Sequence, residues 1–227
     1  MSLYRLDKDV LAFRPGAAEF IRAYTTNTPD RPLNSFVDLR GRIVAVFDQL
    51  SLGPGEVLAA VGRPFVRRLA SHLERFLDLC GVSMEKTPLS AYHDLDSRYE
   101  PGPGERTIPQ KAGRLLLSAS QSAEAGAGVG LDEYTLYRVR NGLPMQGVDY
   151  DDELLLNVFD EECVSYTKGC YLGQEILARV HSRSGPPRRL RVKSEDECSA
   201  PQREAMTSAV TDPGTGKRMG FVFEELR

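Results

Sequence analysis

The chain has 227 residues, of which 41% are hydrophobic and 27% are charged, and its formal net charge is −3. This is the composition of a soluble globular protein with room for one full core and a smaller appended unit. No apolar run approaches the roughly 20 residues that a transmembrane helix needs, and the small net charge gives no overall attraction to nucleic acid.

The first ten residues alternate charged and apolar side chains. They lack the apolar stretch and the small-residue cleavage site of a secretory signal, so we expect a cytoplasmic protein with no membrane partner. The four cysteines lie far apart and form no Cys-x-x-Cys or Cys/His spacing of the zinc type. The sequence therefore predicts no metal site.

The first half of the chain mixes strand-like runs with helical patterns. Residues 16–24 have apolar side chains at helical spacing after a Pro-Gly pair, which predicts a short amphipathic helix packed on a sheet. Residues 36–50 are rich in Val, Ile and Phe around Gly41, which indicates two strands that meet at a tight turn. Residues 56–61 are a candidate for the next strand.

A longer helix follows. From Pro64 onward apolar residues repeat at intervals of three and four until Gly81, which predicts a helix between these residues. Shorter strand-like pieces follow at residues 82–86 and 114–118, separated by a Pro/Gly-rich segment at 100–113. This order favours an α+β fold with largely antiparallel strands over a doubly wound sheet.

Residues 121–130 are small and rich in glycine. A nucleotide-binding loop is one interpretation of their Gly-x-Gly-x-Gly pattern. No apolar strand leads into the glycines, however, and neither a Walker lysine nor a Rossmann acid accompanies them. We therefore expect a flexible surface connection.

The second half begins with a helix predicted at residues 132–141, closed by Asn141-Gly142. Near the end, residues 190–192 and 219–223 are apolar β-type runs, and residues 206–210 are a third candidate. A unit of about 40 residues is too small to bury a core alone and must pack on the main domain. We therefore expect a main domain at residues 1–185 and a small β unit at 186–227.

Charge is uneven along the second half. Residues 149–162 are rich in Asp and Glu, whereas residues 176–194 contain no acid and six cations: Arg179, Arg183, Arg188, Arg189, Arg191 and Lys193. The basic run could meet the carboxylates of a ligand, an acidic partner or RNA phosphates, or could be a solvated strand and loop.

Residues 168–175 read KGCYLGQE, and no helical or strand periodicity explains them. Gly169 and Gly173 permit a positive φ or a close approach of another group. Lys168 would favour the thiolate of Cys170 if its ammonium points at the sulfur. The alternative is that Cys170 is a small buried hydrophobic side chain.

This string is similar to the K-G-C-Y-x-G-Q-E signature of the YgfZ family of folate-binding proteins, in the aminomethyltransferase (glycine cleavage T-protein) superfamily. Residues 137–144 resemble the family's L-R-I-x-x-G-I-P segment, and residues 183–190 resemble its R-G-x-P-x-R-x-L continuation. Thr26-Asn27 and residues 38–43 resemble the T-N-D and K-G-R-I elements. The likeness extends over residues 10–192.

The resemblance implies a pseudo-threefold α+β domain whose central hole accepts tetrahydrofolate, followed by a β-barrel that is shortened here. It implies a folate-binding accessory protein that supports the assembly or repair of iron–sulfur cluster proteins, including radical enzymes that modify tRNA. Its partners would be folate and iron–sulfur client proteins or assembly factors.

The resemblance also implies roles for single residues. Cys170 is the candidate thiolate with Lys168 beside it, Gly169 and Gly173 are structural, and no permanently bound metal is expected. The implied folate-binding residues are Asn27, Arg138, Tyr171, Gln174, Glu175 and Arg179. For Arg138, a salt-bridged residue on an exposed helix is the alternative.

The sequence departs from the working enzymes of the superfamily, which carry acids after a Gly-Gly pair. The matching element at residues 41–46 has Ala45 and Val46 at those positions, and the chain lacks the G-Y-T-G-E string that supplies the pterin-binding glutamate. Hydrocarbon side chains cannot stabilise a cation during transfer. A tetrahydrofolate-dependent aminomethyltransferase or demethylase is therefore the alternative function, and a folate-independent interaction module is the second alternative.

Overall fold

The computed structural model describes residues 2–183 and 185–226. Its main element is a seven-stranded sheet in the order β2-β3-β4-β1-β5-β7-β6, in which every neighbouring pair of described strands is antiparallel. The strands of this sheet are β1 (Leu3–Arg14), β2 (Leu33–Val37), β3 (Ile43–Ser51), β4 (Val57–Gly62), β5 (Ser83–Asp94), β6 (Arg106–Pro109) and β7 (Arg114–Ser118).

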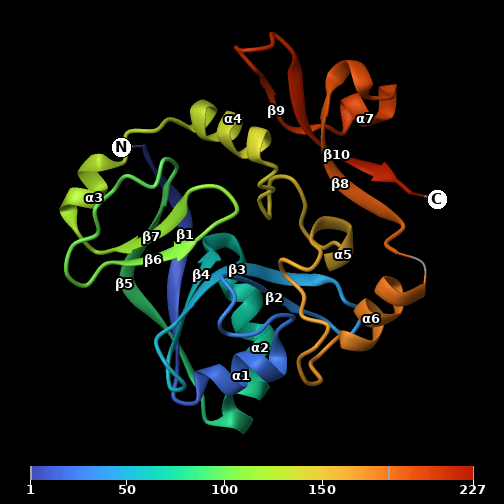
Figure 1. Cartoon of the computed structure of the whole chain (residues 1–227). Coiled ribbons are helices and arrows are strands. Elements are labelled where there is room, and N and C mark those ends of the chain that lie inside the picture. The colour runs from blue at the N-terminus through green and yellow to red at the C-terminus, as the bar shows by residue number, and fades with distance from the viewer. Residues whose placement is uncertain (1, 184, 227) are drawn as a thin grey trace.

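Helices lie on both sides of this sheet (Figure 1). They are α1 (Ala17–Tyr24), α2 (Val66–Cys80), α3 (Gln121–Gly126), α4 (Leu131–Asn141), α5 (Leu155–Val158) and α6 (Gln174–Arg183); a 3₁₀ turn, η1 (Arg63–Phe65), precedes α2. The predicted α+β class with antiparallel strands is confirmed.

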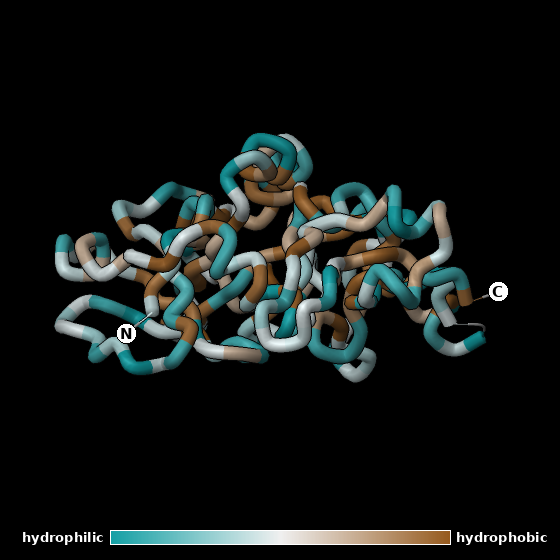
Figure 2. The backbone as a smooth tube through the Cα atoms, turned by 90° about the horizontal axis from the view of Figure 1, so that it is seen from above, coloured by the Kyte–Doolittle hydropathy of each residue, from teal (hydrophilic) through white to brown (hydrophobic). Residues whose placement is uncertain are grey.

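The central strand β1 contributes to two cores because its side chains alternate between the faces of the sheet. Leu11 and Phe13 join the apolar cluster that α1 and α2 cover, whereas Val10 and Ala12 join the cluster that includes Tyr134 of α4. In Figure 2 the apolar stretches lie mainly inside the trace and the hydrophilic stretches at its periphery.

A third apolar cluster supports the second half of the chain. Val37 and Ile43 of the β2–β3 hairpin belong to this cluster. They pack with Leu155 of α5, with Leu177 of α6 and with Tyr171, which precedes α6. The segment before α6 and the helix itself are therefore packed against one end of the sheet.

The C-terminal unit is a three-stranded sheet of β8 (Arg188–Ser194), β10 (Arg218–Glu225) and β9 (Thr207–Thr211), in the order β8-β10-β9. A 3₁₀ turn, η2 (Glu195–Glu197), and the short helix α7 (Ala200–Glu204) connect β8 to β9. Strands β9 and β10 contact α4, and β8 contacts α5 (Figure 1). Within the described residues this sheet has two edge strands and is not closed, so it does not form the barrel-like unit that the family resemblance implies.

Several elements agree with the sequence predictions. The helices predicted at 16–24, between Pro64 and Gly81, and at 132–141 correspond to α1, α2 and α4, and the predicted hairpin corresponds to β2 and β3. The three C-terminal runs correspond to β8, β9 and β10.

The local structure differs from the sequence predictions in several places. Strand β1 and helix α6 were not predicted, β6 lies inside the Pro/Gly-rich segment, and residues 121–126 form the short helix α3 rather than a flexible connection. Among the described residues, no helix is both long and apolar enough to cross a bilayer.

Candidate functional site

The signature residues 168–173 form an irregular loop that leads into α6. Tyr171 anchors the loop because its side chain is buried in the third apolar cluster. Gly173 has a φ of 80°, and a Cβ at this position would collide with the carbonyl oxygen of Asp38 and lie 2.9 Å from Val37 Cγ2. Gly173 therefore meets both conditions that favour glycine, a left-handed φ and a close approach.

Gly169 meets neither condition. Its φ lies outside the left-handed range, and a Cβ at this position would have no atom within 4 Å. Of the two glycines that were expected to be structural, only Gly173 occupies a position that requires glycine.

Lys168 ties the loop to the end of α1. Its ammonium donates hydrogen bonds to the carbonyl oxygens of Arg22 (2.7 Å), Thr25 and Asn27 (3.2 Å), and it lies 4.5 Å from the ring centroid of Tyr171. Burial, followed by the nearby charge of Arg22, lowers the pKa of Lys168 to about 7. An ammonium has three N–H donors and here all three are used, so none remains for Cys170. The predicted action of Lys168 on the sulfur required the ammonium to point at Cys170, and these contacts do not support it.

The Thr26-Asn27 pair supports the segment that precedes the signature. Thr26 Oγ1 donates to the carbonyl oxygen of Cys163 (2.7 Å), and Asn27 Nδ2 donates to those of Leu33 and Glu162 (3.1 Å each). The Oδ1 of Asn27 accepts a hydrogen bond from the amide of Thr28 (3.0 Å). Asn27 thus uses its side-chain donors and acceptor within the protein.

The two cysteines of this region have opposite environments. Cys163 is fully buried, and burial raises the pKa of its thiol. Cys170 is a free, exposed cysteine. The alternative that Cys170 is a small buried hydrophobic side chain is therefore wrong.

The remaining signature residues lie on the first turns of α6. Glu175 and Arg179 form an ion pair of 2.5 Å across one helical turn, and the Glu175 side chain is 82% exposed. Gln174 begins the helix and is half-buried. These three side chains remain accessible from solvent, unlike Asn27.

Arg138 lies on α4 and its side chain is almost fully buried. Its guanidinium donates to Asp149 Oδ2 (2.7 Å), to the carbonyl oxygen of Leu143 (3.1 Å) and to Ser208 Oγ (2.7 Å). Asp149 also accepts from the hydroxyls of Thr207 and Ser208. Arg138 is thus a buried, ion-paired residue that links α4 to β9. It shares no hydrogen-bond partner with Lys168 of the signature loop.

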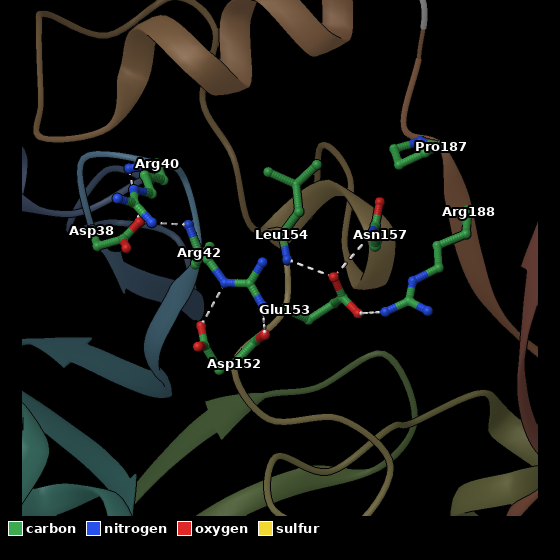
Figure 3. A pocket seen from close by; sticks show the side chains of 9 residues that line it. All are labelled: Asp38, Arg40, Arg42, Asp152, Glu153, Leu154, Asn157, Pro187 and Arg188. Atoms are coloured by element: carbon green, nitrogen blue, oxygen red, sulfur yellow. Dashed lines mark hydrogen bonds and ion pairs between the residues drawn. The ribbon is translucent and has the colours of Figure 1, made fainter. Parts of the chain in front are cut away.

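A polar pocket of about 710 Å³ lies next to the signature loop (Figure 3). The β2–β3 turn, the residues before and within α5, and the start of β8 provide its walls. Its lining residues are Asp38, Arg40, Arg42, Asp152, Glu153, Leu154, Asn157, Pro187 and Arg188. Cys170 is not among them, so the thiol faces solvent and not this pocket.

The pocket and the signature loop share one support. The carbonyl of Asp38 packs against Gly173, while the Asp38 carboxylate accepts hydrogen bonds from the amides of Arg40 (2.8 Å) and Arg42 (2.9 Å) and so closes the turn. Gly41 in this turn has a φ of 71° and lies against Leu177 of α6. A change in the loop would therefore be transmitted to one wall of the pocket.

Ion pairs hold the other walls together. Arg42 Nε donates to Asp152 Oδ1 (2.8 Å), and Arg188 pairs with Glu153. Glu153 Oε1 also accepts from the Leu154 amide and from Asn157 Nδ2, both at 2.9 Å. The pocket was not predicted, although Arg42 lies in the K-G-R-I-like element and Arg188 in the basic run.

The structure therefore brings Lys168, Tyr171 and Asn27 together, since Lys168 contacts both of the others. It places Arg138 in a separate buried network with Asp149. Among the described residues, no group of three or more His, Cys, Asp or Glu side chains is arranged to hold a metal ion.

Comparison with known proteins gives relatives in sequence and in structure, whereas no family model matches the chain. Over 82 residues the chain is 34% identical to the mitochondrial iron-sulfur cluster assembly factor IBA57 of Mus musculus. The matched stretch makes up 34% of this chain and 21% of the relative. The mitochondrial IBA57 homologue of Mycosarcoma maydis is 34% identical over 85 residues, 36% of the chain and 20% of the relative. The matched stretch is thus a small part of both relatives.

The whole fold resembles a solved enzyme structure. The glycine cleavage system aminomethyltransferase T from Bartonella henselae matches with a TM-score of 0.75 and 14% identity, over 99% of this chain and 78% of that chain. The chain thus has the fold of the aminomethyltransferase T structure, and about a third of its sequence is similar to the IBA57 assembly factors.

Proposed function

Because the chain combines a YgfZ-type signature with the fold of aminomethyltransferase T, we propose that it is an accessory protein for the assembly or repair of iron–sulfur proteins. The observation that carries this proposal is the exposed thiol of Cys170, held on a loop that is fixed on both sides. Lys168 fixes one side through three carbonyl oxygens, and Gly173 fixes the other against Asp38.

The chemistry of the thiol supports this role. Cysteine thiolates are the usual ligands of iron–sulfur clusters, and an accessible sulfur can bind iron as it loses its proton. Since the described residues of this chain offer no further metal-ligating cluster, Cys170 would supply one ligand and a client or assembly partner the others. Radical enzymes that modify tRNA are the clients we propose.

We further propose that the protein binds tetrahydrofolate, as the fold of its enzyme relative supports. Gln174, Glu175 and Arg179 stay the candidate contacts because they are accessible, whereas the buried Tyr171 would act by holding the loop in place. Asn27 and Arg138 would have to exchange internal hydrogen bonds for ligand contacts, so we expect them to act indirectly. Titration of tetrahydrofolate into the protein, followed by calorimetry, tests binding; no heat of binding would leave a folate-independent module.

We expect binding without turnover. Ala45 and Val46 carry no carboxylate that could stabilise a cation during transfer. Ala45 is fully buried opposite Phe36, and the amide of Val46 donates to Gln146 Oε1 (2.9 Å). Formation of methylene-tetrahydrofolate from folate and an aminomethyl donor would contradict this expectation.

The test of the cluster role is complementation of a strain deleted for the gene that encodes this chain. Cys170→Ser is expected to lose the restoration of cluster-dependent enzyme activity while the protein stays folded, because Cys170 is exposed. Cys80→Ser is the matched control, since Cys80 is the other exposed free cysteine. Full rescue by Cys170→Ser would remove the thiol from the proposed function.

A further inference from the structure

We propose that strand β8 of the C-terminal unit binds an extended acidic segment of a partner protein, which adds to the sheet as a fourth strand. The sheet has the order β8-β10-β9, so β8 is one of its two edges (Figure 1). An edge strand presents backbone N–H and C=O groups that can pair with another chain. The proposal concerns this unit alone and depends neither on Cys170 nor on the cluster role.

The hydrogen bonds between β8 and β10 show which backbone groups of β8 are free. The two strands pair along all seven residues of β8 without a bulge. Next to this ladder, the Leu226 amide donates to the Pro187 carbonyl oxygen (2.9 Å). Bonded and non-bonded pairs alternate in an antiparallel ladder, so the odd-numbered residues of β8 bond to β10. The N–H and C=O groups of Leu190 and Val192 therefore point away from β10, and no other described residue bonds to them.

The other edge strands of the described residues are covered or interrupted. On β2, the Ser35 carbonyl oxygen accepts a hydrogen bond from the Thr26 amide (3.0 Å). Strand β6 has four residues and ends in Pro109, which cannot donate to another strand. In β9, Ser208 has a left-handed φ of 49°, and the strand contacts α4. Strand β8 is therefore the long and regular edge that remains for a partner.

The beginning of this edge borders open space. Pro187 and Arg188 line the pocket of about 710 Å³, as Figure 3 shows. The side chains of a strand point to the faces of its sheet, whereas its N–H and C=O groups lie in the plane of the sheet. Leu190 packs on the third apolar cluster through its side chain. This packing holds β8 by one face and uses none of the edge groups, and an added strand would continue into the pocket.

The charge of β8 selects an acidic occupant. The strand contains four cations and no acid. Arg189 and Lys193 pair with Asp160 and Glu224, whereas Arg191 is exposed and forms no ion pair with a described residue. Like charges on opposite strands are destabilising and opposite charges are stabilising. A second copy paired through its own β8 would set cations against cations, so an acidic segment fits this edge better than a copy of the chain.

The alternation along β8 predicts the pattern of the partner segment. Arg191 bonds to β10, so for an added strand it occupies a non-hydrogen-bonded position, where opposite side chains are closest. We expect Asp or Glu opposite this residue. Leu190 and Val192 are half-buried, and apolar residues are expected opposite them. The partner segment is therefore one in which acidic and apolar residues alternate.

The test is a fluorescence-anisotropy titration of the whole protein with a labelled heptapeptide in which Val and Glu alternate, starting with Val. One reference peptide has Lys in place of Glu, and another has the same composition arranged in an acidic and an apolar block. Two further peptides carry one N-methyl group each. On the third residue, a Val, this group removes a donor to β8; on the fourth, a Glu, it removes a donor that faces solvent.

We expect the alternating peptide to bind at least about tenfold more tightly than the Lys peptide and the block peptide. N-methylation of the Val should weaken binding by about threefold to tenfold, whereas N-methylation of the Glu should leave it unchanged. Arg191→Glu should weaken binding by about fivefold or more. Arg203→Glu is the matched control, because Arg203 is an exposed arginine of the same unit that lines a separate pocket.

Hydrogen exchange gives a readout that a loose electrostatic contact would not change. On binding of the alternating peptide, the amides of Leu190 and Val192 should exchange more slowly, because they gain a partner. The amide of Arg191 already bonds to β10, and its exchange should change less.

Several results would overturn the proposal. These are equal affinity for the block peptide, equal effects of the two N-methyl groups, equal affinity of Arg191→Glu and Arg203→Glu, or no binding of the alternating peptide. A dimer of the free protein in which the Leu190 and Val192 amides are already protected would make a second copy the occupant and would also contradict it. None of these results bears on complementation by Cys170→Ser, so the two proposals fail separately.

Discussion

Gly173 and Gly169 share one signature but make different demands on the chain. Gly173→Ala must force a Cβ against the Asp38 carbonyl at a φ of 80°, and we expect a loss of at least about 2 kcal/mol in the free energy of unfolding. Gly169→Ala is the control, with an expected change within about 1 kcal/mol, because its Cβ meets open space. Urea unfolding of both variants measures the difference; similar values would show that Gly173 does not hold the loop.

Lys168 stabilises the loop through contacts that lie 141 to 146 residues away in the sequence. Lys168→Met would leave three carbonyl oxygens without this donor, so we expect a loss of about 1–3 kcal/mol in the free energy of unfolding. Lys111→Met is the control, because Lys111 is an exposed lysine that donates to a single carbonyl at 3.5 Å. An equal loss in both variants would contradict a specific role for Lys168.

The sequence identified the residues of this site but not their contacts. The eight-residue string singled out Cys170, which the structure shows to be exposed. The partner of Lys168 could not be predicted, because proximity in sequence suggested Cys170 whereas the fold offers the carbonyl oxygens at the end of α1. Asn157 Oδ1 has no hydrogen-bond partner among the described residues, and the sequence gives no sign of this because the orientation of the amide depends on the position of Glu153.

At the scale of secondary structure, predictions succeeded where a glycine in the left-handed conformation ends a helix. Helix α2 begins after Pro64 and ends before Gly81, and α4 ends before Gly142, as the sequence indicates. Strand β1 escaped prediction because it is central: Val10 to Phe13 are all buried, so the expected alternation of apolar and polar residues disappears where both faces are covered. Helix α6 was not predicted because the basic run that includes Arg179 and Arg183 was assigned to a strand and loop.

Arg138 of α4 and its buried partner Asp149 are linked to the C-terminal sheet by hydrogen bonds with Ser208 and Thr207 of β9. Arg138→Met would leave Asp149 buried without its cation, and we expect a loss of about 3 kcal/mol in the free energy of unfolding. Arg140→Met is the matched control on the same helix, because Arg140 pairs with Asp212 of the same unit but its side chain is 46% exposed. Because this pair is at the surface, we expect Arg140→Met to lower the free energy of unfolding by only about 0–1 kcal/mol.

Hydrogen exchange of the β9 amides provides a second readout for these two variants. Faster exchange in Arg138→Met than in Arg140→Met would show that the buried pair attaches the sheet to α4. Equal exchange and equal stability would place the attachment elsewhere, for example in the apolar contacts of Leu190 and Phe223 with the third cluster.

Over the whole molecule, the uneven charge of the sequence becomes a set of internal ion pairs. Glu153 and Asp160 of the acidic stretch pair with Arg188 and Arg189 of the basic run, and Asp152 pairs with Arg42. Two cations of the basic run thus pair with the acidic stretch, and two others, Arg179 and Lys193, pair with Glu175 and Glu224. The basic run was predicted as a possible contact for RNA or ligand carboxylates; these ion pairs reduce the positive charge that it presents.

The pH dependence of stability should reflect the buried histidine His93 on β5. Its Nδ1 lies 3.1 Å from the Tyr134 hydroxyl and its Nε2 lies 2.9 Å from the Ala112 carbonyl oxygen. Burial lowers the pKa of His93 below its usual value, more than the Ala112 carbonyl raises it. As pH falls through 6.5, the unfolded chain binds a proton that the folded protein does not, so the free energy of unfolding should decrease.

We expect this decrease to approach a slope of about 1.4 kcal/mol per pH unit for each such histidine, and His72, whose pKa burial also lowers, should add to it. His93→Gln is expected to flatten the decrease between pH 7.5 and 5.5, since glutamine does not titrate, although it should lower stability at pH 7.5 through lost packing. The measurement is urea unfolding of both proteins across this range. Parallel curves would show that His93 binds a proton equally in the folded and unfolded states, and that the interior between β5 and α4 tolerates the charge.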